Sequence, residues 1–83
     1  MSTRKLSNIS VRRFRKFLLK EGLICIKINK GRGGHEKWVK TGLMRPIIIQ
    51  THIDPIPEFI VKQVLRHLEM DKESFFMKYE KIK

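Results

Sequence analysis

Hydrophobic residues recur at helical spacing near the start of the chain. The run begins after Ser10 and places its apolar residues on one helical face, with arginine and lysine at most other positions: Val11, Phe14, Phe17 and Leu18. Ser10 is a suitable N-terminal cap, and Gly22 is a natural stop because glycine readily adopts the left-handed backbone that ends a helix. The pattern therefore predicts a first helix between these two residues.

The middle of the chain changes to the pattern of strands. The run LICIKIN (residues 23–29) is rich in β-branched residues and alternates Ile24, Ile26 and Ile28 with Leu23, Cys25 and Lys27. The segments GHEKWVK (34–40) and RPIIIQ (45–50) follow, separated by a turn at Thr41 and Gly42. Connections this short require antiparallel hairpins, so we expect a three-stranded meander.

Two further helices are expected after the strands. Asp54, Pro55 and Pro57 interrupt the sheet pattern, and an apolar helical stripe follows them: Ile60, Val61, Val64, Leu65 and Leu68. A short last helix from Asp71 would fold its aromatic residues back on the domain: Phe75, Phe76 and Tyr79. The predicted fold class is α+β, in the order α-β-β-β-α with helices on one face of the sheet and a short C-terminal helical extension.

Alternation along residues 34–40 divides this strand into two faces. His35, Lys37 and Val39 fall on one face, and Glu36, Trp38 and Lys40 on the other. Trp38 is the largest apolar candidate for packing against the helices. If it points to the core, His35 points away from it.

Length and charge narrow the classes of function. A chain of 83 residues fits a single domain (1–83), with the core at about 10–76. Its net charge of +11 is spread along the folded segments, which favours a nucleic-acid-binding surface over a polybasic membrane anchor. A single cysteine, Cys25, excludes an internal disulfide and suggests a reducing compartment. No stretch has the pattern of a signal peptide or a membrane span, so we expect a cytoplasmic protein with no membrane partner.

The segment KGRGGHEKW (residues 30–38) has the strongest chemical signal. Its clustered glycines would form a tight turn or let a partner's backbone come close, and His35 follows them directly. Taken alone, the segment is more often a simple hairpin turn, and His35 a solvated strand residue.

The order of these segments resembles the HicA, or YcfA-like, family of small toxins. The residues that carry the resemblance are KGRGGHEKW, the III of the third strand, His52 after it and LEMDKESFF, so that it covers residues 10–76. The family motif of a glycine, a small residue and a histidine corresponds to Gly33, Gly34 and His35. Gly34 and Glu36 stand where the family usually has serine and a second histidine, and Gln50 and Thr51 replace the proline often found before the later histidine.

The resemblance implies a fold similar to double-stranded-RNA-binding domains and a ribonuclease that cleaves mRNA with His35 as its catalytic residue. It also implies neutralisation by a HicB-type antitoxin, which is a protein partner that covers the active site. The residues that match RNA-contacting positions, or flank them, are Lys30, Arg32, Gly33, Gly34, Lys37 and His52. For His52, a structural role in the turn and an RNA contact are both open.

The chemistry that this implies needs few groups. RNA supplies its own nucleophile, the 2′-hydroxyl, so an enzyme must remove that proton, stabilise the pentavalent phosphorus and protonate the leaving oxygen. Imidazole titrates near neutral pH and can serve as base or acid, while neighbouring cations such as Arg32 and Lys37 would stabilise the developing charge. The scheme calls for no metal and no cofactor. Two alternatives remain: a non-catalytic RNA-binding module of the same fold, and a basic subunit that binds an acidic protein.

Overall fold

Three antiparallel strands and three helices make up the part of the chain that the computed structural model describes, residues 5–29 and 34–82. The elements follow one another as α1 (Val11–Lys20), β1 (Ile24–Asn29), β2 (His35–Val39), β3 (Ile47–Gln50), α2 (Glu58–His67) and α3 (Lys72–Tyr79). The small α+β architecture and the helix, three strands, helix layout therefore agree with the sequence-based prediction.

Both ends of α1 form as predicted. The Ser10 side chain accepts a hydrogen bond from the backbone N–H of Arg13 at 3.2 Å, which satisfies one of the otherwise unpaired amides of the first turn. At the other end Gly22 has a φ of +90°, and the next amide, that of Leu23, donates to the carbonyl of Leu18 at 3.0 Å. The chain thus turns sharply from α1 into the sheet.

The sheet has the strand order β1-β2-β3, with β2 in the centre. Both strand pairs are antiparallel, as predicted. The simple alternation predicted for β1 is wrong beyond Cys25, because the register shifts between Cys25 and Lys27 and leaves Ile26 as an extra residue. Ile24 pairs with Val39, as simple alternation predicts. The next residue on that face of β2, Lys37, pairs with Lys27 instead of Ile26.

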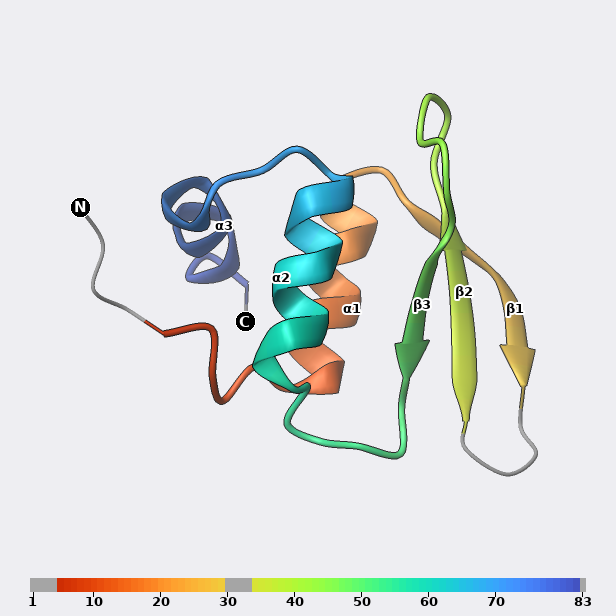
Figure 1. Ribbon diagram of the computed structural model, residues 1–83, viewed down its shortest axis with the longest axis horizontal. Coiled ribbons are helices and arrows are strands. Elements are labelled where there is room, and N and C mark those ends of the chain that lie inside the picture. Colours follow the sequence, from red (N-terminus) through yellow and green to blue (C-terminus); the bar gives the residue numbers. More distant parts are fainter. Residues whose placement is uncertain (1–4, 30–33, 83) are drawn as a thin grey trace.

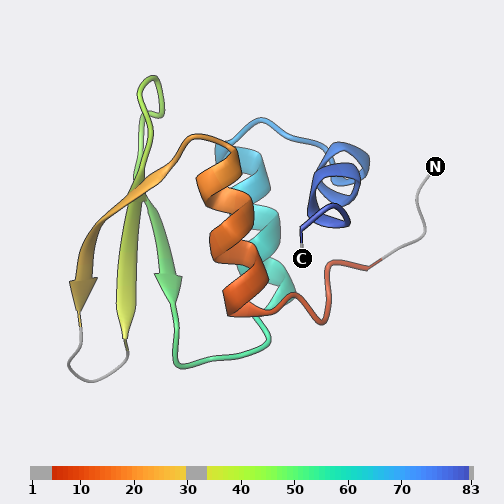
Figure 2. The ribbon, with the colours of Figure 1, turned by 180° about the vertical axis from the view of Figure 1, so that it is seen from behind.

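The helices lie on one side of the sheet, as Figures 1 and 2 show: α1 and α2 run next to each other beside the strands, and α3 lies beyond them. The aromatic residues predicted to fold back, Phe75, Phe76 and Tyr79, are all buried. Phe17 and Phe75 meet edge to face with ring centroids 4.9 Å apart. The C-terminal extension is therefore part of the core, which also includes Leu6, Ile9 and Ile82.

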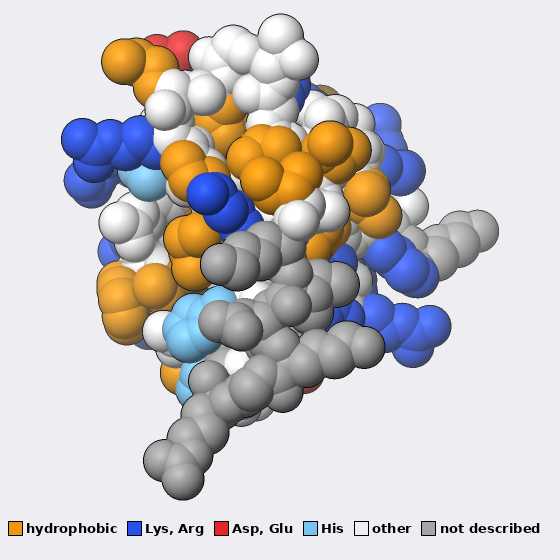
Figure 3. Space-filling view, turned by 90° about the vertical axis from the view of Figure 1, so that its right-hand side faces the viewer, with side chains coloured by type: hydrophobic (Ala, Val, Ile, Leu, Met, Phe, Trp, Pro, Cys, Tyr) orange, Lys and Arg blue, Asp and Glu red, His pale blue; other side chains and the backbone are white. Residues whose placement is uncertain are grey.

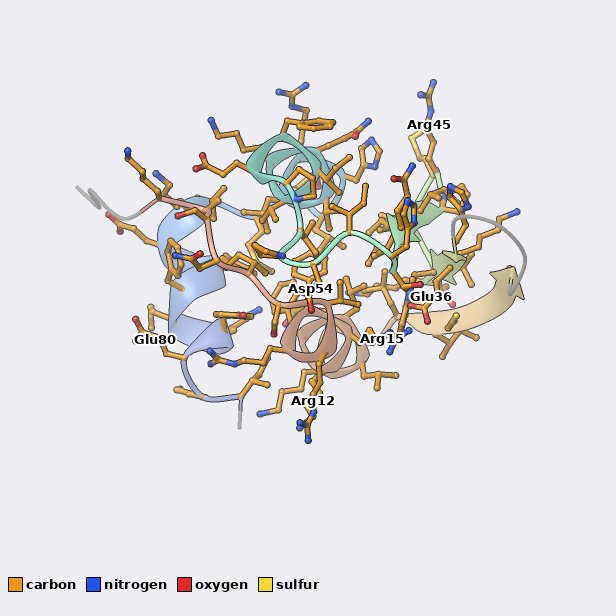
Figure 4. The ribbon with its side chains drawn as sticks, turned by 90° about the horizontal axis from the view of Figure 1, so that it is seen from below. Arg12, Arg15, Glu36, Arg45, Asp54 and Glu80 are labelled. Carbon is orange, nitrogen blue, oxygen red and sulfur yellow. The ribbon has the colours of Figure 1, made fainter. Side chains whose placement is uncertain are left out.

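The loop between β3 and α2 is tied to the start of α1. The Asp54 carboxylate accepts from the backbone N–H of Val11 at 3.2 Å, and Ile56 donates its N–H to the carbonyl of Ile9 at 2.8 Å. Asp54 is labelled beside α1 in Figure 4. These contacts hold in place the loop that carries His52. Among the described helices, none combines the length and the apolar character needed to cross a membrane.

Candidate functional site

Two histidines from separate segments meet at one end of the sheet. His35 is the first residue of β2, and its register partner Gln50 is the last residue of β3, so that His52 follows just beyond the strand. The ring centroids of His35 and His52 are 6.3 Å apart and the ring planes make an angle of 60°. His35 is half-buried and His52 is exposed. Both imidazoles can therefore approach one small group from solvent.

A close backbone contact holds these two segments together. The carbonyl of Gly34 accepts two hydrogen bonds from Thr51, one from its backbone N–H at 2.7 Å and one from its hydroxyl Oγ1 at 2.6 Å. Gly34 has a φ of +44°, and a Cβ atom at this position would lie 2.5 Å from Thr51 Oγ1. Glycine is required here both by the left-handed backbone and by the threonine hydroxyl packed against it.

The two faces of β2 are as predicted from the sequence. Trp38 and Glu36 are buried, while His35, Lys37 and Val39 are half-buried on the opposite, helix-free face. Figure 3 looks onto this face and shows hydrophobic side chains gathered on it, with histidines beside them and cationic side chains around the rim. Lys37 lies two residues along the strand from His35, a rise of about 7 Å, on the same face.

The opposite face of β2 is fixed by a buried charge. Glu36, only 4% exposed, accepts from Arg15 Nε at 3.0 Å, from a second Arg15 nitrogen, and from the indole Nε1 of Trp38 at 3.2 Å. Hydrogen bonding to Glu36 raises the pKa of the Arg15 guanidinium above its ordinary value. Figure 4 shows Arg15 of α1 directed at Glu36. Glu36 therefore holds β2 against α1 and does not belong to the face that carries His35.

The structure assembles only part of the predicted site. It places Gly34, His35 and His52 at one end of the sheet, and Lys37 two residues further along β2 on the same face as His35. Lys30, Arg32 and Gly33, also predicted to contact RNA, lie outside the described residues. Within the ranges 5–29 and 34–82, no three histidine, cysteine or acidic side chains are grouped so as to hold a metal ion.

Two contributors to the geometry were not predicted. The Arg15–Glu36 pair had a usable signal, since alternation puts Glu36 on the same face as Trp38, and a carboxylate on a core face requires a partner. The role of Thr51 had none, because its contact with Gly34 depends on the pairing of strands distant in sequence.

Comparison with known proteins gives no match for this chain among protein-family models, curated proteins or solved structures. The assignment of function therefore depends on the chemistry of the described residues.

Proposed function

We propose that this chain is a metal-independent endoribonuclease of the HicA type, with His35 as its catalytic residue. The observation that supports the proposal best is the pair of imidazoles, His35 and His52, whose ring centroids lie 6.3 Å apart at the solvent-facing end of the sheet. RNA cleavage without a metal requires one group to take up a proton and another to donate one at opposite sides of a phosphate. Two imidazoles at this separation suit that requirement.

In the proposed reaction, the RNA 2′-hydroxyl attacks the adjacent phosphorus and loses its proton to one imidazole. The bond from phosphorus to the 5′-oxygen of the next nucleotide breaks, and the other imidazole protonates this leaving oxygen. The products are a 2′,3′-cyclic phosphate and a free 5′-hydroxyl. Lys37, on the same face as His35, supplies positive charge to the pentavalent phosphorus.

The departures from the family motif fit this proposal. Glu36 stands where a second histidine is usual, but its side chain faces α1 and pairs with Arg15, so the residue at 36 acts on the core face of β2. At position 34 the family's serine is absent, and the hydroxyl of Thr51 occupies the adjacent space. The order of helix, three antiparallel strands and helix, with the helices on one side of the sheet, further supports a fold of the double-stranded-RNA-binding-domain type.

The proposal includes an acidic protein partner of the HicB-antitoxin type that covers the site. The helix-free sheet face that carries His35 has exposed apolar side chains of a kind that partners bury: Ile24, opposite Val39, is 58% exposed, and Ile48, opposite Lys37, is 48% exposed. The net charge of +11 favours an acidic partner.

The test is incubation of the purified chain with end-labelled, mixed-sequence RNA in the presence of a chelator, followed by analysis of fragments and their ends. We expect cleavage that leaves cyclic phosphates, is lost in His35→Ala and persists in Lys81→Ala, which removes an exposed cation after α3. His52→Ala separates the two readings of that residue, because a purely structural role would lower the melting temperature and a role in proton transfer would change the pH dependence of the rate. Intact RNA with binding retained in all variants would instead indicate a non-catalytic RNA-binding module.

A further inference from the structure

A groove made of three adjoining hollows that share lining residues follows the edge strand β3, and the loop before it, along α2. Its first section, of about 300 Å³, is lined in part by Gln50, Ile53 and Phe59. It shares Ile48, Ile60 and Gln63 with a narrower middle section of about 110 Å³, and His67 joins this middle section to a third, of about 500 Å³. We call these three sections together the β3–α2 groove.

The first section of the groove adjoins the histidine pair. Gln50, in its wall, is the register partner of His35, and Ile53 directly follows His52. A nucleic acid that places a phosphate between the two imidazoles can therefore extend its neighbouring nucleotide over or into this section.

The chemistry of this section suits an unpaired base. Phe59 is 69% exposed and Ile53 is 38% exposed, so both offer apolar surface to a ligand. A base can stack on an exposed aromatic ring, and side-chain amides such as those of Gln50 and Gln63 both donate and accept hydrogen bonds to base edges. Bases in a duplex are stacked and paired, so only a single strand can present one here.

The far section of the groove carries two arginines. Its lining includes Arg45, Arg66 and His67 and one acidic residue, Glu69, alongside Gly42, Leu43 and Met44. Arg45 lies two residues before β3 begins and Gln50 is the last residue of β3, so the length of this strand separates Arg45 from the histidine pair. Figure 3 shows this spatial order on the left-hand side of the face: cationic side chains and a histidine lie at the top, hydrophobic side chains in the middle and histidine below.

We propose that the β3–α2 groove binds single-stranded RNA next to the cleaved phosphate, with one unpaired base against Phe59 and a backbone phosphate at Arg45 and Arg66. This inference rests on the proposed function, since the histidine pair identifies the ligand as RNA. It makes the groove the part of the surface that selects single strands over duplexes.

The test measures binding separately from cleavage. All variants are made in the His35→Ala chain, and the dissociation constant for a labelled, unstructured RNA is measured by fluorescence anisotropy. We expect Phe59→Ala to weaken binding about tenfold. The pair Arg45→Ala and Arg66→Ala should also weaken it about tenfold and reduce the slope of log Kd against log salt by about 0.7 per lost phosphate contact.

Two controls are matched to these changes. Met77→Ala removes a side chain of α3 that is 65% exposed, as Phe59→Ala does on α2, and Arg12→Ala with Lys81→Ala removes two exposed cations away from the groove. Circular dichroism melting curves confirm that each variant is folded. The control variants should have dissociation constants close to that of the His35→Ala parent. A duplex of the same sequence should compete poorly with the labelled single strand.

The outcomes separate this inference from the proposed function. The proposed role of the groove is refuted by any of three results: the groove variants bind RNA as tightly as the parent, the duplex competes equally well, or the chain does not bind single-stranded RNA. Each of these results refutes it even if the unmodified chain cleaves RNA. Conversely, if the groove variants bind RNA more weakly but the unmodified chain does not cleave RNA, the groove is supported as an RNA-binding site and the proposed ribonuclease activity is refuted.

Discussion

Replacing Gly34 with alanine tests the contact that holds the two histidine-bearing segments together. The added Cβ would lie 2.5 Å from Thr51 Oγ1, so the threonine side chain must move and lose its 2.6 Å hydrogen bond to the Gly34 carbonyl. That loss costs about 1 kcal/mol. A φ of +44° adds about 1–2 kcal/mol for any residue with a Cβ. We therefore expect Gly34→Ala to reduce the free energy of unfolding by about 2–3 kcal/mol.

The steric part of this cost can be isolated with a double-mutant cycle. Thr51→Ala alone should cost about 1 kcal/mol through the lost hydroxyl bond. In that background Gly34→Ala meets no hydroxyl, and its cost should fall to the backbone contribution of about 1–2 kcal/mol. The coupling between the two positions is then about 1 kcal/mol.

The assay is urea unfolding of the four chains, with thermal melting as a second probe. For a domain of this size, the Gly34→Ala cost corresponds to a fall in melting temperature of roughly 10 °C or more. Equal costs of Gly34→Ala in the unmodified chain and in the Thr51→Ala chain would refute the steric contact. A neutral Gly34→Ala would refute both the contact and the strained backbone.

Further predictions concern the core and the helix ends. Arg15→Ala should lower the free energy of unfolding, measured in urea, by about 2 kcal/mol, because it leaves the Glu36 carboxylate buried with the Trp38 indole as its remaining donor. This cost is smaller than that of breaking a fully buried ion pair, since the Arg15 side chain is 43% exposed. Phe75→Ala should cost about 3–5 kcal/mol in the same assay, whereas its exposed neighbour Met77→Ala should cost less than about 0.5. Asp71 accepts hydrogen bonds from the backbone and the side chain of Ser74, and these bonds lower the pKa of its carboxyl. The carboxylate therefore contributes fully to stability above the unfolded-state pKa of about 3.9. This contribution is lost as the pH falls through the lower pKa of the folded state. Asp71→Asn keeps an acceptor that does not titrate and should flatten the fall in melting temperature over that acidic range.

Features decided within a few neighbouring residues were predicted well from the sequence. The cap at Ser10, the stop at Gly22 and the start of the last helix at Asp71 all depend on the local backbone, and each forms as expected. The face of the sheet that His35 occupies was also predictable, because alternation ties it to the burial of Trp38.

Features that depend on register were not predictable. In β1 the alternation of apolar residues suits either face of the sheet, so nothing in ICIKIN marks Ile26 as the extra residue of a bulge. The approach of His52 to His35 follows from the pairing of His35 with Gln50, which fixes where β3 ends relative to β2. The β3–α2 groove likewise arises from two elements whose separation the sequence does not encode locally.

Register also explains why a buried carboxylate is useful next to the candidate site. A slip of one residue in β2 would exchange its faces, placing His35 in the core and Glu36 in solvent. Glu36 opposes that slip, because its partner Arg15 belongs to α1 and is available only on the helix-facing side. In the described part of the chain Glu36 is the one charged residue that is buried, and it directly follows the histidine whose direction matters most. The Arg15–Glu36 ion pair therefore takes no part in the proposed chemistry. Its role is to fix the register of β2, so that His35 lies on the helix-free face.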